Sequence, residues 1–326
     1  MNSFGTIFRL SIFGESHGSG VGITIDGVPP GIEFSADDME PDLARRRSGA
    51  RGTTPRQESD IPEILSGVYK GRTTGAPLTL LFRNSNTRSG DYDKFREIPR
   101  PGHADFTSMI KYKGYTDPRG GGHFSGRITL GIVAAGALAK KILPSVKISS
   151  RIIEIGGEKD YAGVIEKMIE EKDSAGGIVE VTAAGIPAGL GEPFFNSMES
   201  CLSRLVFSIP AVRGIEFGAG FESARMKGSR CNDPIISTDG KTSSNNAGGI
   251  NGGITNGNDL VFRVAVKPTS SIGKAQETVN LKSGVVEKLE VEGRHDVCIT
   301  LRTPVIFEAC AAIATADLYL VNKTYN

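Results

Sequence analysis

Four histidines lie in glycine-rich or polar segments of this sequence, where a side chain can exchange protons with a ligand. His17 follows Gly-Glu-Ser, His103 lies in Arg-Pro-Gly-His-Ala-Asp, His123 follows three glycines, and His295 lies in Gly-Arg-His-Asp. Imidazole titrates near pH ~6.5, and glycine lets the backbone approach a ligand closely. A solvent-exposed loop position would explain any one of them, but the four together predict an acid/base site.

Arginines near these histidines indicate an anionic ligand. Residues 45–56 contain five arginines in twelve positions, and Arg100, Arg127 and Arg294 each lie within four residues of a histidine. Guanidinium groups bind phosphate and carboxylate in a bidentate manner, so the pattern favours a small molecule with several negative charges. A solvated basic patch that binds nucleic acid is the alternative for residues 45–56.

The composition argues against nucleic acid as the ligand. Lys and Arg total 38 against 37 Asp and Glu, which gives a formal net charge of +1, and the chain has no Trp and 7% aromatic residues. A nucleic-acid surface usually combines a basic domain with aromatic side chains that stack on bases. We therefore expect no nucleic-acid partner.

Metal and common nucleotide sites lack their usual spacing here. The sequence contains no HxH, HExxH or CxxC pattern, so we expect no metal site. It also lacks a P-loop and a GxGxxG turn after a strand.

The segment 267–271, Lys-Pro-Thr-Ser-Ser, follows a strand-like segment and suits a phosphate or the edge of a ring. A Ser/Thr turn is the alternative for that segment.

Strands and helices that could hold these segments alternate along the chain. Alternating apolar residues predict strands in four segments, 22–28, 78–82, 177–182 and 259–266. A capped helix is expected after residues 35–38, at 39–47, and Ala-rich stretches predict buried helices at 128–143 and 305–320. These elements indicate a mixed α and β fold in one domain, residues 1–326. The more charged segment 144–173 is expected at its periphery.

No segment predicts membrane insertion or export. The longest uncharged apolar stretch, residues 128–139, has 12 residues, whereas a spanning helix needs about 20. The N-terminus lacks a basic segment followed by an apolar one. Four cysteines in 326 residues are too sparse for a disulfide framework. We therefore expect a cytoplasmic protein with reduced thiols.

Ordered motifs along almost the whole chain give a more specific indication. They are GESHG at 14–18, DL at 42–43, RRR at 45–47, RPGHAD at 100–105, RGGG at 119–122, GIPAGLGEP at 185–193, NAGG at 246–249, KPTSS at 267–271 and GRHD at 293–296. In this set the sequence resembles the chorismate synthase family. The resemblance implies an α+β fold of the chorismate-synthase kind, a β-α-β layered sandwich with antiparallel sheets around helices, and assembly as a homotetramer.

The same resemblance implies the activity. Family members convert 5-enolpyruvylshikimate 3-phosphate to chorismate, the last step of the shikimate pathway, by a 1,4-anti-elimination of phosphate and a ring hydrogen. The reaction requires reduced FMN (FMNH2) but consumes no net electrons. The substrate carries two carboxylates and a phosphate, which matches the arginines described above. NADPH or an external flavin reductase would supply the reduced flavin.

Roles of single residues also follow from the resemblance. His103 would protonate the departing phosphate, His17 would manage the proton that neutralises the reduced flavin anion, and Asp296 would assist proton removal through flavin N5. The expected substrate-binding residues are Arg46, Arg51, Arg100, Arg127 and Arg294. The expected cofactor-binding residues are Arg46, Arg51, His123, Phe124, Ser125, Ala211, Gly252, Lys267, Pro268, Thr269, Ser270, Ser271 and Arg294.

Two other functions stay open at this point. A noncatalytic module would bind small anions or nucleic acid through residues 45–56. A lyase without flavin would eliminate phosphate and would work in oxidised, flavin-free conditions. The sequence also leaves open whether the protein reduces its own flavin.

Overall fold

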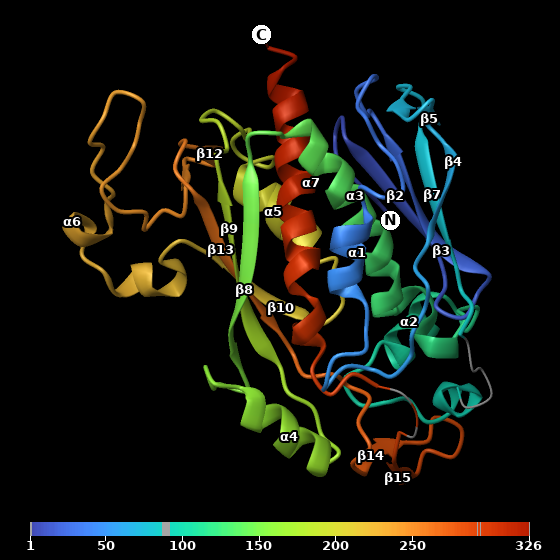
Figure 1. The fold of residues 1–326 in the computed structure, drawn as a ribbon. Helices are drawn as coiled ribbons and strands as arrows, with labels where there is room; N and C mark the ends of the chain where they lie inside the picture. The colour runs from blue at the N-terminus through green and yellow to red at the C-terminus, as the bar shows by residue number, and fades with distance from the viewer. Residues whose placement is uncertain (1, 87–91, 292, 294, 326) are drawn as a thin grey trace.

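Two antiparallel sheets enclose a layer of helices, so the layers follow the order sheet, helices, sheet (Figure 1). The computed structural model describes residues 2–86, 92–291, 293 and 295–325. One cluster of buried hydrophobic side chains runs through both sheets and the helices between them, from Phe8 to Leu318.

The first sheet has five strands in the order β1-β2-β3-β7-β4, and each neighbouring pair is antiparallel. Its strands are Ser3–Phe4 (β1), Arg9–Gly14 (β2), Gly20–Asp26 (β3), Leu78–Arg83 (β7) and Pro62–Ser66 (β4). On β7 the alternate residues Leu78, Leu80 and Phe82 are fully buried. A strand places every second side chain on the same face, so this apolar face packs on the helices.

The second sheet has four strands in the order β10-β13-β9-β8, again antiparallel. Its strands are Val212–Phe217 (β10), Leu260–Val266 (β13), Gly177–Ala184 (β9) and Lys147–Ile155 (β8). Phe262 lies opposite Val181 in the register of β13 and β9, and both side chains are fully buried. Such cross-strand apolar pairs hold the register, because a one-residue slip would turn them to solvent.

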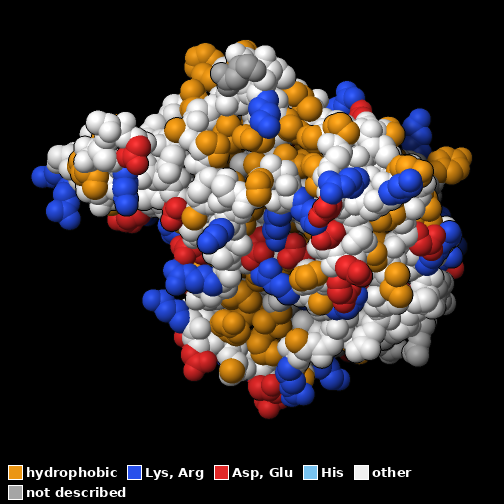
Figure 2. Space-filling view, turned by 45° about the horizontal axis from the view of Figure 1, so that its top comes forward, with side chains coloured by type: hydrophobic (Ala, Val, Ile, Leu, Met, Phe, Trp, Pro, Cys, Tyr) orange, Lys and Arg blue, Asp and Glu red, His pale blue; other side chains and the backbone are white. Residues whose placement is uncertain are grey.

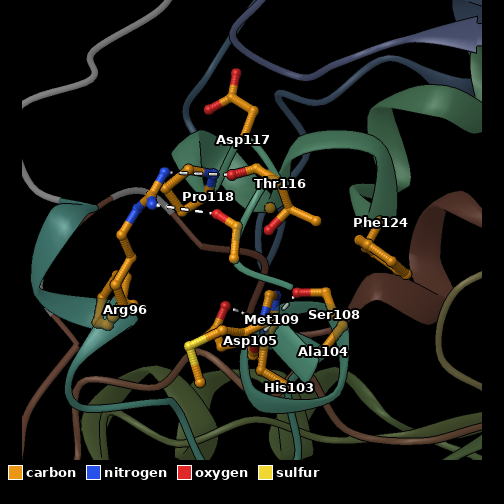
Figure 3. A pocket seen from close by; sticks show the side chains of 13 residues that line it. Arg96, His103, Ala104, Asp105, Ser108, Met109, Thr116, Asp117, Pro118 and Phe124 are labelled. Atoms are coloured by element: carbon orange, nitrogen blue, oxygen red, sulfur yellow. Dashed lines mark hydrogen bonds and ion pairs between the residues drawn. The ribbon is translucent and has the colours of Figure 1, made fainter. Parts of the chain in front are cut away.

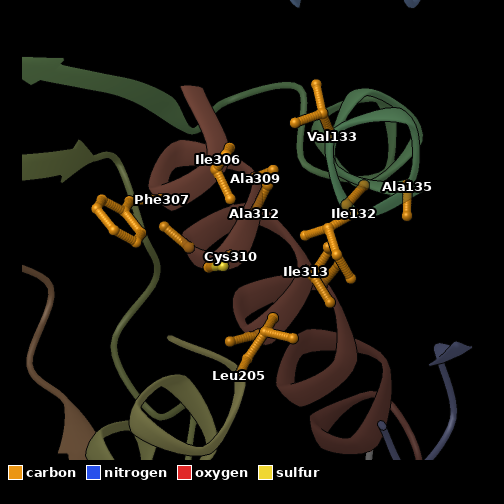
Figure 4. Packing of buried hydrophobic residues seen from close by; sticks show 14 of the residues in the cluster. Ile132, Val133, Ala135, Leu205, Ile306, Phe307, Ala309, Cys310, Ala312 and Ile313 are labelled. Atoms are coloured by element: carbon orange, nitrogen blue, oxygen red, sulfur yellow. The ribbon is translucent and has the colours of Figure 1, made fainter. Parts of the chain in front are cut away.

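Two long helices fill the middle layer, α3 (Thr129–Ile142) and α7 (Pro304–Asn322), with α1 (Glu40–Arg46) and α5 (Met198–Val206) beside them. Figure 4 shows Ile132 of α3 and Ile313 of α7 among the apolar side chains that fill the space between these helices. The two backbones lie so close that a Cβ at Gly136 would come within 2.4 Å of the Cβ of Ala309. Only glycine fits at that crossing.

Helix α7 is long and apolar enough to cross a membrane by length and composition, but 78% of its most apolar window is buried inside the fold. No other helix in the described ranges passes that test. The buried carboxylate of Asp317 accepts hydrogen bonds from the backbone N–H groups of Thr6, Ile7 and Phe8 at 2.8–3.0 Å. These hydrogen bonds satisfy the buried carboxylate and tie the N-terminal segment to α7. The burial and these bonds identify α7 as a core helix of the fold.

Shorter helices, hairpins and turns lie at the edges of the two sheets and the helix layer. The helices there are α2 (Asp105–Lys111), α4 (Ala162–Glu170) and α6 (Gly228–Cys231). Two-stranded hairpins are formed by β5 (Val68–Tyr69) with β6 (Arg72–Thr73), β11 (Ile250–Asn251) with β12 (Ile254–Thr255), and β14 (Gln276–Val279) with β15 (Val286–Leu289). Short 3-10 turns are η1 (Asp93–Arg96), η2 (Arg119–Phe124), η3 (Gly126–Ile128), η4 (Gly220–Arg225) and η5 (Ile299–Arg302).

An arm that contains η4 and α6 projects from the second sheet, at the left in Figure 1. Figure 2 shows the same arm at the left edge, and acidic and basic side chains mixed over the face in view. That face therefore lacks the single-sign charge of a nucleic-acid surface.

The structure confirms the predicted fold class, and all four predicted strands and all three predicted helices lie within two residues of their expected ends. The charged segment 144–173 is not wholly peripheral, which corrects the expectation, because β8 pairs with β9 along its length. β8 is an edge strand and is charged because one of its faces meets solvent. Asp38 accepts a bond from the Ser35 backbone N–H at 2.7 Å, whereas Met39 at the helix start contributes no side-chain cap.

Candidate active site

A large cavity collects segments that are far apart in the sequence. Its volume is about 1200 Å³, above the ~300–1,000 Å³ usual for a site that holds one small molecule. The walls combine apolar and charged side chains and come from residues 46–60, 100–107, 120–132, 207–213, 267–271 and 295–306. The cavity therefore has room for two ligands at once.

His17 is buried in the wall of this cavity, with its ring edge-on to Tyr92 at a centroid distance of 5.2 Å. The η2 turn passes against it, because a Cβ at Gly120 would lie 2.5 Å from Cδ2 of His17. Gly120, Gly121 and Gly122 have φ angles of 59°, 80° and 52°, in the left-handed region that favours glycine. Gly120 thus makes room for the imidazole ring of His17, and Gly121 and Gly122 let the turn bend beside it.

His103, Asp105 and Arg100 form a bonded cluster. His103 and Asp105 line a small cavity of about 80 Å³ (Figure 3), and His103 and Arg100 line the large one. Nδ1 of His103 lies 2.6 Å from Oδ1 of Asp105. Arg100 donates to both Asp105 oxygens at 2.8 Å and to Oγ of Ser271 at 3.0 Å. Burial alone would raise the pKa of Asp105, but the bonds from Arg100 and His103 hold it well below its usual value.

Arg46 and Arg127 are both buried in the cavity wall, and both pair with Asp60. Arg46 donates from Nε to Oγ1 of Thr129 at 3.0 Å and from Nη2 to the carbonyl of Gly126 at 2.8 Å. Burial, with two more arginines nearby, lowers the pKa of Arg46. Among the described residues Nη2 of Arg127 has no hydrogen-bond partner. A buried donor of this kind is costly unless a ligand satisfies it.

Arg56 links the histidine loop to a second buried carboxylate. It donates to Oγ of Ser16 at 2.9 Å and to Oε1 of Glu58 at 2.7 Å. Glu58 also accepts bonds from the backbone N–H and the hydroxyl of Ser85, both at 2.8 Å. Burial would raise the pKa of Glu58, but these bonds and the nearby guanidinium groups lower it to about 2.

The expected flavin contacts at 123–125 line the cavity. Nδ1 of His123 lies 2.8 Å from the carbonyl of Gly14, and Nε2 lies 3.1 Å from Oδ1 of Asn2. Phe124 is 39% exposed, so its ring has a free apolar face. Oγ of Ser125 accepts from the backbone N–H of Arg127 at 3.2 Å and caps the η3 turn.

The segment Lys267 to Ser271 also lines the cavity. Nζ of Lys267 donates to Oγ of Ser270 at 2.5 Å and to the carbonyl of Gly102 at 3.2 Å. Burial, with Arg213 nearby, lowers the pKa of Lys267. Within the described ranges Oγ1 of Thr269 is buried without a hydrogen-bond partner. Ala211, at a φ of 71°, and Pro268 also line the cavity.

Asp296 lines the cavity beside Arg302. Its carboxylate accepts from the backbone N–H of Thr54 at 3.0 Å and from Nη1 of Arg302 at 3.3 Å. Nε of Arg302 donates to the carbonyl of Arg46 at 3.0 Å. Arg302 thus joins the group of cavity arginines, although the sequence did not single it out.

Two of the expected binding residues, Arg51 and Gly252, do not line the cavity, and a third lies outside the described residues. Arg51 pairs with Glu166 of α4 and its side chain is 69% exposed. Gly252 lies in the turn between β11 and β12 and does not line the cavity of its own chain. Arg294 lies outside the described residues. Arg100 reaches the cavity, but its guanidinium is bound to Asp105 and Ser271.

The sequence missed the carboxylates that hold the arginines, Glu58, Asp60 and Asp105. Glu58 and Asp60 follow directly on the arginine-rich segment 45–56, and buried guanidinium groups need carboxylate partners. The closeness of Glu58 and Asp60 to these arginines in the sequence could therefore have identified both as partners.

In the part of the chain that the structure describes, no group of three His, Cys, Asp or Glu is placed to hold a metal ion.

The motifs that build this cavity occur together in one protein family. A family model described as chorismate synthase matches residues 8–320. The chain belongs to the chorismate synthase family.

Proteins of this family resemble the chain over almost their full lengths. The chain is 59% identical to the chorismate synthase of Chitinophaga pinensis, with 100% of this chain and 98% of that protein covered. It is 47% identical to the chorismate synthase of Methanosarcina mazei, with 97% and 95% covered. A solved structure, "Crystal Structure of Chorismate Synthase", matches with a TM-score of 0.74 and 29% identity over 98% of this chain and 93% of that one.

Membership of the chorismate synthase family confirms the predicted family and enzyme class. The chain is a lyase of aromatic biosynthesis. The noncatalytic binding module, one of the two alternatives left by the sequence, is therefore excluded.

Proposed function

We propose that the cavity converts 5-enolpyruvylshikimate 3-phosphate to chorismate by 1,4-anti-elimination of phosphate. One C–O bond and one ring C–H bond break, a C=C bond forms, and the reaction has no net gain or loss of electrons. The observation that carries the proposal is the group of Arg46, Arg127 and Arg302 in the wall of one cavity of about 1200 Å³. A substrate with two carboxylates and a phosphate needs several such groups to replace its water.

Binding of the substrate would use the donor that the fold leaves unsatisfied. Nη2 of Arg127 has no partner among the described residues, while Nη1 is held by Asp60. An anionic oxygen that reaches this guanidinium would satisfy the buried N–H. Electrostatic preorganisation of this kind costs no reorientation during the reaction.

Reduced FMN fits the rest of the cavity. The orphaned hydroxyl of Thr269 and the ammonium of Lys267 suit the polar parts of a flavin, and Phe124 and the apolar wall residues suit its ring. Residues 123–125, Ala211 and 267–271 would hold it. When bound, reduced FMN supplies electron density to the substrate ring. Arg51, Gly252 and Arg294 stay predictions from the family resemblance.

The chain's own acid and base groups would manage the protons. His103 would donate a proton to the departing phosphate, since its ring lines the cavity beside Lys267 and Ser271. His17 and Asp296 line the same cavity and would handle the other protons. Asp105 holds His103 and Arg302 holds Asp296 in place before the substrate arrives.

The proposal also covers the domain organisation, the oligomeric state and the source of the reduced flavin. We infer one domain over residues 1–326, supported by the core cluster that spans both sheets. The family resemblance supports a homotetramer in the cytoplasm. Reduced flavin would come from NADPH on this protein or from an external reductase.

The test is a phosphate-release assay under anaerobic conditions with reduced FMN and the purified protein. Phosphate and chorismate should form in equal amounts, above an enzyme-free control. Release without any flavin would instead support the flavin-independent lyase. An arm with oxidised FMN and NADPH, and no added reductase, tests whether the protein reduces its own flavin.

A further inference from the structure

The position of His103 is fixed by a carboxylate that the sequence did not assign to the site. Oδ1 of Asp105 lies 2.6 Å from Nδ1 of His103, while Nη2 of Arg100 lies 3.1 Å from the same nitrogen. A guanidinium only donates hydrogen bonds, and an ionised carboxylate only accepts them. The shorter contact therefore identifies Nδ1 as the protonated nitrogen, which donates to Asp105.

Arg100 in turn keeps Asp105 ionised and immobile. It donates from Nε to Oδ2 and from Nη2 to Oδ1, and its backbone N–H donates to Oδ2 at 3.1 Å. Its guanidinium stacks over the ring of Phe95 at 4.4 Å, and both charged side chains are less than a tenth exposed. A buried, bidentate pair of this kind has little freedom to rotate.

The remaining ring nitrogen lies beside the η2 glycine turn. A Cβ at Gly121 would lie 3.7 Å from Nε2 of His103, and both residues line the large cavity as well as the small one. With Nδ1 engaged by Asp105, only Nε2 is able to exchange a proton with a ligand. The ring could not rotate to present Nδ1 without breaking its bond to the carboxylate.

We propose that Asp105 is the positioning residue for His103, which it holds with Nδ1–H bound and Nε2 presented to the substrate. This inference rests on the proposed function. In the step that it serves, the Nε2–H bond of the imidazolium breaks and the proton passes to an oxygen of the departing phosphate. The Nδ1–H bond stays intact, and the neutral ring takes its next proton from water.

Asp105→Asn tests the proposal because it keeps the shape and removes one acceptor. Oδ2 of Asp105 accepts two bonds from Arg100, from Nε and from the backbone N–H, so we expect the amide oxygen at that position and the NH2 group in place of Oδ1, where it meets Nδ1 of His103. Nδ1 then has to accept, and the neutral ring carries its proton on Nε2. The turnover number should fall about 100-fold, the scale of a lost general acid, with flavin affinity unchanged. Asp105→Glu, which restores a carboxylate, should recover part of the loss.

Nitrogen NMR of histidine-labelled protein gives a second readout that a purely structural role would not move. In the wild-type protein at a pH where the ring is neutral, Nδ1 of His103 should show the shift of a protonated nitrogen. A bare Nδ1 in the wild type would overturn the proposal even if Asp105→Asn does not fold. In Asp105→Asn the proton should be on Nε2.

The matched control is Asp26→Asn, which breaks an ion pair with Arg9 at the surface, outside the cavity. It should turn over like the wild type. Wild-type turnover in Asp105→Asn would overturn the positioning role while leaving the proposed function intact. Absence of phosphate release from the wild type would instead contradict the proposed function itself.

Discussion

Asp60 binds Nη1 of Arg127 and leaves Nη2 of the same guanidinium without a partner among the described residues. Both side chains are buried, and Asp60 also lies 3.7 Å from Nη1 of Arg46. A fold gains nothing from an unsatisfied buried donor. The arrangement is explained if Asp60 orients the guanidinium of Arg127 so that Nη2 can bind an anion in the cavity.

Arg127→Lys should weaken substrate binding while keeping the charge. Lysine has a single ammonium and cannot bind Asp60 and an anion in two directions as guanidinium does. We expect KM for the substrate to rise about tenfold, equivalent to ~1.4 kcal/mol, in steady-state assays. Arg151→Lys, at an exposed pair with Glu180, is the control. Equal KM values for Arg127→Lys and the control would contradict an anion-binding role.

Gly120→Ala should disable the site more than it destabilises the fold. Its φ of 59° costs an L-residue about 1–2 kcal/mol, and the new Cβ would meet the ring of His17 at 2.5 Å. Gly71→Ala is the matched control, because its φ is 72° and nothing lies within 4 Å of its Cβ. Both variants carry the cost of the positive φ, Gly120→Ala should lose further thermal stability through the contact with His17, and only Gly120→Ala should lose turnover. If both lose turnover equally, the glycine does not serve His17.

Lys267→Ala should weaken flavin binding. The ammonium is held toward the cavity by Gly102 and Ser270, so its removal takes a positive charge from the wall. Fluorescence titration with FMN should show an affinity about tenfold lower, or ~1.4 kcal/mol. Lys274→Ala, at a surface pair with Asp173, should bind like the wild type. Unchanged affinity in Lys267→Ala would remove this residue from the flavin site.

Gly136→Ala should destabilise the core, although alanine favours helices. The new Cβ would lie 2.4 Å from the Cβ of Ala309 on α7, and overpacking of a core costs about 1–3 kcal/mol. Gly163→Ala in α4 is the matched control, because its Cβ would meet nothing within 4 Å. Urea unfolding should show a loss for the first variant and a gain of about 0.5–1 kcal/mol for the second. A gain in both would contradict the close crossing of α3 and α7.

Glu58→Gln should reduce the acid sensitivity of the fold. The pKa of Glu58 is lowered in the folded protein from 4.5 to about 2, so its ionised form stabilises the fold above about pH 4.5. That contribution is lost as the pH falls toward 2. The free energy of unfolding should be higher for the wild type than for Glu58→Gln at pH 7, and the gap should narrow below pH 4.5. A gap independent of pH would show that Glu58 does not act through its charge.

The periodic pattern of apolar residues in the sequence predicted the strands and helices that bury one regular face or most of their surface. The four alternate residues of β13 from Leu260 to Val266 are buried, and α7 is buried on most sides, so both patterns were visible in the sequence. β10 was missed because Gly214 interrupts it at a register shift against β13. Glycine inside a strand often marks such an irregularity, which the sequence alone does not separate from a loop.

Residue type alone was enough to select candidate histidines and arginines, but their partners became visible only in the folded structure. The histidines could be chosen because of their chemistry and their glycine neighbours. Their partners could not, because Asp60 and Arg127 are 67 positions apart in the sequence and only the fold brings them together. Arg51 illustrates the opposite case, since a long side chain near the cavity instead pairs with Glu166.

The central claim is that the substrate and the flavin share the cavity of about 1200 Å³. A crystal structure of the protein with FMN and 5-enolpyruvylshikimate 3-phosphate tests it most directly. We expect both molecules in this cavity, with an anionic group on Nη2 of Arg127 and the phosphate within hydrogen-bond distance of Nε2 of His103. Either ligand bound only at a separate surface, with Arg127 unoccupied, would contradict the claim.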